Sequence, residues 1–176
     1  ACSPGVAHAV YTSTVTDDIE GVDRDTEYPS MGAYEYEKIQ ASNIGLWPPV
    51  KGIGWLEWEQ GNGCKTAVFM KQGNVLPETA FPINGVTYAA SDIFGNGDQI
   101  GTSGWFCVYN SVYFEDIIIS GDNDEYTIMA CEYYGSEGNE IYLTESADGN
   151  PNVGMLGSDI NEMENNIINV SPNPTK

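Results

Sequence analysis

Short segments rich in β-branched and aromatic residues recur along this chain, and clusters of Gly, Asn, Asp and Pro separate them. Such a pattern is typical of an all-β sandwich or barrel, and helical spacing of apolar positions is nearly absent. It predicts seven strands, the count of a small immunoglobulin-like β-sandwich. Their predicted bounds are 39–46, 53–59, 66–71, 105–110, 113–120, 125–133 and 141–146.

Two predicted strands alternate clearly enough to assign faces. In the first, "GWLEWEQ", Trp55 and Trp58 are three residues apart, so we expect them to face opposite sides of the sheet. In the second, "EYTIMACEYYG", Glu132 has the parity of Tyr126 and is expected to point inward. Because a buried carboxylate needs a partner, we interpret Glu132 as a structural hydrogen-bonding residue rather than a catalytic one.

A long connection, residues 73–104, lies between the third and fourth predicted strands. Connections of this length are uncommon, and they are usually functional or carry structure of their own. Five apolar residues are expected to hold it against the sandwich: Val86, Tyr88, Ile93, Phe94 and Ile100.

Charge excludes two classes of partner. The chain has 26 acidic residues against 6 Lys and Arg, for a formal net charge of −20. The negative electrostatic potential of such a chain repels phosphate backbones and anionic lipid surfaces, so we expect no nucleic-acid partner. No apolar run approaches the ~20 residues of a membrane helix, and we expect no membrane insertion.

No set of residues specifies a reaction, so we predict no catalytic residue and no enzyme activity. Glu57 and Glu59 share a strand face, but the solvent-exposed side of a strand explains both. His8 is the only histidine, which disfavours a catalytic triad or a histidine metal site. We expect no cofactor and keep structural calcium as the alternative. Its weak candidate ligands lie in turn-forming loops and are Asp92, Asp98, Asp122 and Asp124.

Aromatic residues suggest a sugar-binding surface. The four tryptophans, at positions 47, 55, 58 and 105, could form a stacking platform, although core packing is the default for Trp on a strand. Because Trp55 and Trp58 should face opposite ways, we expect one of them to be exposed. The binding candidates are Trp55, Trp58, Trp105 and Tyr88.

The four cysteines are widely spaced and allow three pairings, which the sequence alone cannot distinguish. In an antiparallel sandwich the start of the 66–71 strand would lie beside the end of the 125–133 strand. That arrangement suggests a bridge between Cys64 and Cys131, which we state as a hypothesis.

Residues 3–37 resemble the closing coil of secreted, pectate-lyase-like right-handed parallel β-helix proteins. The residues that carry the resemblance are Ser3, Pro4, Asp18, Ile19, Gly21, Arg24 and Gly32-Ala33-Tyr34-Glu35. The resemblance implies that any catalytic groove would lie in preceding coils. It also implies that an apolar face including Ile19, Val22 and Met31 has no stacking partner within this chain.

Residues 41–150 resemble a fibronectin type III-like domain of exported bacterial proteins. The motifs are "WLEWEQGNG", "KTAVFMKQG", "FPINGVTYAASDIFGNGDQIG", "WFCVYN", "YTIMACEYYG" and "YLTESADGNP". The resemblance implies that Tyr126 is a tyrosine-corner residue, whose hydroxyl binds nearby backbone. The Leu-x-Pro that usually precedes this tyrosine is replaced here by "ISGDNDEY".

The final residues, "NIINVSPNPTK", resemble the opening of a type IX secretion sorting domain. Val170, Pro172, Asn173, Pro174 and Lys176 match. The resemblance implies the secretion machinery as a partner and a location outside the cell or on the outer-membrane surface. Together with the coil resemblance, it leads us to expect that the protein continues beyond both ends of this sequence.

We therefore predict four segments: a β-helix coil at 1–38, a fibronectin type III-like sandwich at 39–150, a linker at 151–166 and the start of a sorting domain at 167–176. The predicted function is that of a non-catalytic spacer or docking region. Two alternatives remain open. One is carbohydrate binding, with a polysaccharide as partner. The other is adhesion, with a cell-surface protein bound through residues 73–104.

Overall fold

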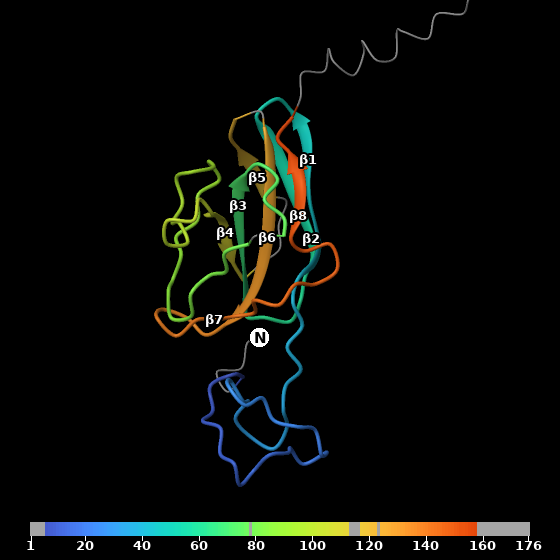
Figure 1. Cartoon of the computed structure of the whole chain (residues 1–176), viewed down its shortest axis with the longest axis vertical. Helices are drawn as coiled ribbons and strands as arrows, with labels where there is room; N and C mark the ends of the chain where they lie inside the picture. The colour runs from blue at the N-terminus through green and yellow to red at the C-terminus, as the bar shows by residue number, and fades with distance from the viewer. Residues whose placement is uncertain (1–5, 78, 113–116, 123, 158–176) are drawn as a thin grey trace, which may run out of the picture.

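The structure is a computed structural model that describes residues 6–77, 79–112, 117–122 and 124–157. These residues form eight strands: β1 Ser42–Val50, β2 Ile53–Glu59, β3 Lys65–Gln72, β4 Phe106–Ser111, β5 Ile117–Ser120, β6 Glu125–Tyr134, β7 Ile141–Tyr142 and β8 Asn152–Met155. They contain no helix, and so none that could cross a membrane. The strands form two antiparallel sheets, which confirms the all-β, sandwich-like architecture (Figure 1).

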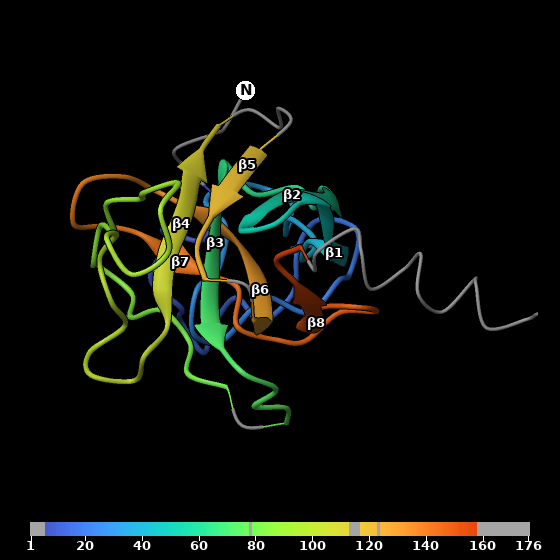
Figure 2. The ribbon, with the colours of Figure 1, turned by 90° about the horizontal axis from the view of Figure 1, so that it is seen from above.

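The smaller sheet has the order β1-β2-β5, and the larger one has the order β4-β3-β6-β7, with β8 also paired to β6. Viewed from above, β3, β4 and β6 lie side by side in one layer (Figure 2). The main core joins the two sheets, since Leu46 and Leu56 of the smaller sheet pack with Val68 and Ile128 of the larger one. Burial of such side chains is the main term that stabilises a sandwich.

The larger sheet is buried on both faces, and this explains why β3 and β6 show almost no exposed positions. Its second face carries a separate core that contains Phe69, Met129 and Trp105. The connection 73–104 supplies Tyr88 and Ile100 to this core, and its ribbon runs beside the larger sheet (Figure 1). Of the five residues predicted to hold it there, Tyr88 and Ile100 are buried and Phe94 packs against the main core, whereas Val86 and Ile93 are exposed.

Most predicted strands are found, and β2 has the predicted bounds. The first predicted strand, 39–46, differs from β1, which spans Ser42–Val50. It passes through Pro48 and Pro49, which an edge strand tolerates because one side of its backbone needs no partner. The last predicted strand, 141–146, is only two residues long as β7. Beyond it the side-chain amide of Gln40 binds the carbonyls of Leu143 and Glu145 in place of a strand partner.

The predicted linker at 151–166 needs a correction at its start, because β8 occupies Asn152–Met155 and pairs with the first half of β6. Asn152 also donates a hydrogen bond to the Ile44 carbonyl, at 2.8 Å. A Cβ on Gly154 would lie 2.6 Å from that of Leu46, so the close packing of β8 on β1 depends on glycine. Residues 158–176, which include the predicted sorting-domain start, and residues 113–116 of the fifth predicted strand lie outside the described residues.

The N-terminal segment, residues 6–38, lies at the β7 end of the sandwich (Figure 1). It is irregular apart from an antiparallel bridge between Asp17 and Asp23. Both Asp18 carboxylate oxygens accept backbone hydrogen bonds, Oδ1 from Val22 at 2.9 Å and Oδ2 from Glu35 at 2.9 Å. Side-chain hydrogen bonds therefore act together with backbone hydrogen bonds, such as that from the Ile19 N–H to the Ala33 carbonyl at 2.8 Å, to hold this coil together.

Arg24 is the second residue, after Asp18, whose side chain makes several hydrogen bonds within the coil. Its guanidinium donates to the carbonyls of Ser30 and Gly32, at 3.1 and 2.6 Å, and lies 3.7 Å from the Glu35 carboxylate. Glu35 in turn accepts a hydrogen bond from the Ser30 hydroxyl, at 3.2 Å. The structure thus brings together the described motif residues that carry the β-helix resemblance, although the resemblance itself stays a prediction.

Candidate functional site

Two exposed tryptophans lie side by side on the outer face of the smaller sheet. Trp47 of β1 and Trp55 of β2 are Cα partners in the strand register, and Trp55 is also the partner of Ile118 on β5. The exposed fractions are 60% for Trp47, 47% for Trp55 and 53% for Ile118. The three side chains therefore form an apolar row across all three strands, which we call the outer row.

The Trp47 indole lies against Gly45. A Cβ built on Gly45 would be 2.9 Å from Nε1 of Trp47 and 3.3 Å from its Cε2, so the ring occupies the space above this glycine. Gly45 is the Cα partner of Glu57, whose exposed side chain has the parity of Trp55. The outer row thus has a carboxylate beside it on the same face.

The other predicted sugar-binding residues are in the wrong place for that role. Trp58, Trp105 and Tyr88 are 7%, 1% and 3% exposed. The Trp58 ring packs edge-on against Tyr109 at a centroid distance of 5.3 Å, within the main core. Trp105 and Tyr88 belong to the second core, which the sequence pattern does not reveal because the covering loop is remote in the chain. The prediction that one of Trp55 and Trp58 is exposed is confirmed.

Glu132 is fully buried, as predicted from its parity. Its Oε1 accepts hydrogen bonds from the Thr66 hydroxyl at 2.9 Å and from the Gly61 backbone at 3.1 Å. Among the described residues, none makes a hydrogen bond of ordinary geometry to Oε2, although the backbone N–H of Gly63 is near enough to favour the charged form. Burial outweighs these contacts and raises the pKa of Glu132.

The proposed bridge between Cys64 and Cys131 is wrong. Cys131 is a free, buried thiol, as is Cys107, while Cys64 is disulfide-bonded to neither of them. The Cys131 side chain points into the second core from β6. Cys64 instead packs against Val6, Ala7 and Tyr134, so the two sulfur atoms cannot meet. Burial raises the pKa of Cys107 to about 12 and also raises the pKa of Cys131.

The Tyr126 hydroxyl donates a hydrogen bond to the Asp122 carbonyl at 3.1 Å, four residues upstream. A hydrogen bond from this hydroxyl to nearby backbone is what the fibronectin type III resemblance implies for Tyr126, and it forms without the usual Leu-x-Pro. The tyrosine itself is fully buried and packs edge-on against Phe94, at a centroid distance of 4.8 Å.

The candidate calcium ligands act in turns. The Asp98 carboxylate accepts the Ala89 backbone N–H at 2.8 Å, and the Asp124 carboxylate accepts a hydrogen bond from Gln72 at 2.6 Å. Asp92 contributes its backbone carbonyl, which the Ser120 N–H binds at 2.7 Å. In the part of the chain that the structure describes, no three His, Cys, Asp or Glu side chains are grouped to hold a metal ion.

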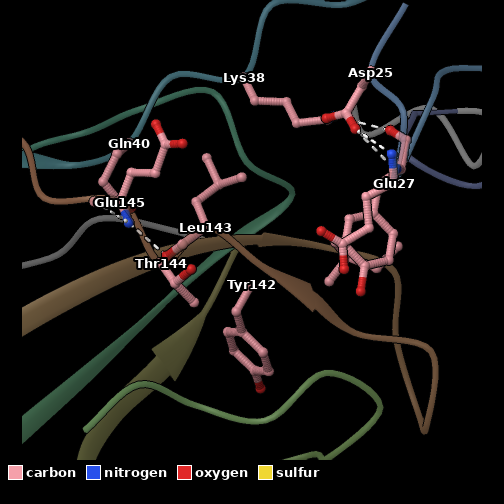
Figure 3. A pocket seen from close by; sticks show the side chains of 10 residues that line it. Asp25, Glu27, Lys38, Gln40, Tyr142, Leu143, Thr144 and Glu145 are labelled. Carbon is pink, nitrogen blue, oxygen red and sulfur yellow. Dashed lines mark hydrogen bonds and ion pairs between the residues drawn. The ribbon is translucent and has the colours of Figure 1, made fainter.

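A cleft of about 280 Å³ lies where the coil meets the sandwich (Figure 3). The coil contributes Asp25, Glu27, Tyr28 and Lys38, and the sandwich contributes Gln40 and residues 141–145. Several of its polar groups already bind one another: Lys38 pairs with Asp25 and donates to the Tyr28 carbonyl at 2.9 Å. Partial burial opposes ionisation of Asp25, but hydrogen bonds led by that of Lys38 lower its pKa. A structural ion pair is thus part of the lining of the cleft.

Asn62 binds the backbone of the residues that connect the coil to the sandwich. Its Oδ1 accepts from the Ile39 backbone at 2.8 Å and from the Tyr134 hydroxyl at 2.7 Å, and its amide donates to the Glu37 carbonyl at 2.7 Å. Tyr134 is 1% exposed and packs edge-on against Tyr36 of the coil, with ring centroids 6.4 Å apart.

An apolar cluster completes this junction. Buried Val6 and Ala7 from the coil pack with Tyr134, and further side chains surround them: Tyr28, Cys64, Ile141 and Leu143. The Asn84 side-chain amide of the sandwich also donates a hydrogen bond to the Tyr28 hydroxyl of the coil, at 2.9 Å. Sequence reasoning missed both Asn62 and the pairing of Trp47 with Trp55. An asparagine in a Gly-rich turn looks like turn chemistry, and the tryptophan pair becomes visible only once the strand register is known.

Comparison with known proteins adds no assignment, since no family model, curated protein or solved structure matches the chain.

Proposed function

We propose that this chain is a non-catalytic spacer and docking region of an exported, cell-surface bacterial protein. In this proposal a fibronectin type III-like sandwich joins a β-helix domain on its N-terminal side to a type IX secretion sorting signal on its C-terminal side. The secretion machinery is the partner of that signal.

The observation that carries the proposal is the construction of the coil–sandwich junction. Asn62, Tyr134 and the apolar cluster of Val6 and Ala7 fix the coil on the sandwich through buried contacts. A merely tethered domain would need only a flexible, polar connection. A junction with its own core instead suits a module that transmits position and force between neighbouring domains.

Two further observations support the finer parts of the proposal. The sheet orders β1-β2-β5 and β4-β3-β6-β7, with the Tyr126–Asp122 hydrogen bond, are what a fibronectin type III-like sandwich is expected to have. A disulfide at Cys64 favours an oxidising compartment and hence export.

The test is to read the coding DNA on both sides of this sequence. The proposal predicts repeated β-helix coils behind a signal peptide upstream, and the rest of a sorting domain downstream. An open reading frame that begins near Ala1 and ends near Lys176 would contradict it, because the sandwich would then have nothing to connect.

A further inference from the structure

We propose that the outer row is a binding site for an uncharged glycan, whose sugar rings stack on the indoles of Trp47 and Trp55. The site is on the smaller sheet, away from the coil–sandwich junction, so this inference is independent of the spacer function.

The first argument is the rigidity of the row. Trp47 and Trp55 are directly opposed in the β1–β2 register, and neighbouring residues Leu46 and Leu56 point into the main core, where they are 6% and 0% exposed. Directly opposed side chains on antiparallel strands have Cβ atoms about 5 Å apart. The Cβ atoms of the two tryptophans are thus neighbours on anchored strands, without a loop whose ordering would weaken binding.

The second argument is the way Gly45 positions Trp47. Because Gly45 has no side chain, the indole can lie over it, with Nε1 2.9 Å from the place a Cβ would take. The indole therefore leans over Gly45, and Trp47 keeps 60% of its surface accessible to a ligand. Aromatic faces are the surfaces on which flat, partly apolar rings stack.

The third argument concerns area, and it favours a small ligand over a protein. A stable protein–protein interface buries roughly 800 Å² on each partner. An aromatic side chain buries about 150–250 Å² when it is fully covered. Trp47, Trp55 and Ile118 are about half exposed, so together they offer a few hundred Å² at most, enough for two or three sugar rings.

The fourth argument concerns charge. Glu57 lies on the same face as Trp55, and its carboxylate can accept hydrogen bonds from sugar hydroxyls. The same carboxylate, and the net charge of −20, would repel a uronate or sulfate. The complementary ligand is therefore a glycan that has hydroxyl donors and no negative charge.

The experiment is calorimetric titration of the whole 176-residue chain with four uncharged hexasaccharides: cellohexaose, laminarihexaose, mannohexaose and xylohexaose. Polygalacturonate serves as the anionic comparison. We expect at least one hexasaccharide to bind and polygalacturonate not to bind. Trp47→Ala and Trp55→Ala should each weaken binding about tenfold or more.

Two further variants make the test decisive. Tyr34→Ala removes an aromatic side chain that is 58% exposed on the coil, and it should bind as the wild type does. Gly45→Ala keeps both tryptophans but forces the Trp47 indole to move, and several-fold weaker binding is expected. If a Trp→Ala variant does not fold, the Gly45→Ala variant still tests whether the outer row binds the glycan. The proposal is wrong if none of the hexasaccharides binds, if polygalacturonate binds equally well, or if the tryptophan and glycine variants bind as tightly as the wild type.

Discussion

Glu132 is a carboxylic acid whose charged form is poorly solvated. Because burial raises its pKa in the folded state, the neutral form is favoured there relative to the unfolded chain. The contribution of Glu132 to the free energy of unfolding is therefore fully present below its unfolded pKa. That contribution is lost as the pH rises through its folded pKa.

We predict that Glu132→Gln makes the free energy of unfolding less dependent on pH. Glutamine keeps an oxygen that can accept from Thr66 and Gly61 but stays neutral, so the free energy of unfolding of the variant relative to that of the wild type should rise steadily from pH 4 to pH 8. Urea unfolding at several pH values measures this. Glu57→Gln, on the exposed face of β2, is the control and should leave the slope unchanged. An advantage for Glu132→Gln that stays constant with pH would contradict the account.

Cys107 and Cys131 are expected to be chemically silent in the folded protein. Both thiols are buried, and their raised pKa values leave almost no thiolate at pH 8. Iodoacetamide should label them only after guanidinium unfolding, as read by peptide mass spectrometry without reduction. The same map should contain no crosslink between Cys64 and Cys131. Rapid labelling of either thiol in the native state would show that the second core opens readily.

At the scale of elements, the coil at 6–38 depends on Asp18 for its shape. Hydrogen bonds from the Glu35 and Val22 backbone lower the pKa of Asp18, so the stability it contributes is present above its unfolded pKa. This stability is lost as the pH falls through the folded pKa.

Asp18→Asn should therefore loosen the coil and leave the sandwich intact. The variant replaces one of the two accepting oxygens with an amide NH2 group, which is a donor and cannot accept the N–H of Glu35 or of Val22. Proteolysis within residues 6–38 at neutral pH should become several-fold faster, with little change in the thermal transition of the sandwich. Asp23→Asn, on the same turn, is the matched control. Equal proteolysis of the two variants would argue against the Asp18 network.

Elements with a strong local pattern could be predicted, and those that depend on distant partners could not. Alternation gave β2 its bounds and placed Glu132 inward, because both follow from a period of two. It could not show that residues 73–104 cover the larger sheet, so Trp105 and Tyr88 were assigned to a surface when they lie in a core. β8 was missed because a short strand containing Gly154 has little β-propensity of its own.

The tryptophan pair illustrates the same limit. Sequence parity separates Trp55 from Trp58, but the partnership of Trp55 with Trp47 depends on the register of the β1–β2 hairpin. That register is set by the two-residue turn, where Gly52 has a φ of +71°, and by the irregular pairing between Trp47 and Val50.

At the scale of the whole molecule, Asn62 joins coil and sandwich through three side-chain hydrogen bonds. Asn62→Ala removes its side-chain hydrogen bonds with Glu37, Ile39 and Tyr134, and we expect about 2 kcal/mol of lost stability. Hydrogen exchange should rise across residues 6–39 more than in the sandwich. Asn74→Ala, an exposed asparagine outside the junction, is the control. Exchange that rises equally in both variants would mean that Asn62 does not hold the coil.

The central claim is that coil and sandwich form one rigid connecting unit. Residual dipolar couplings of backbone amides, measured on the whole chain, test it most directly. The account predicts that couplings from residues 6–38 and from the sandwich strands fit a single alignment tensor of one magnitude, and that Asn62→Ala reduces the couplings of the coil alone. Separate tensors, or much smaller couplings throughout the wild-type coil, would contradict it and leave the sandwich as a domain on a flexible tether.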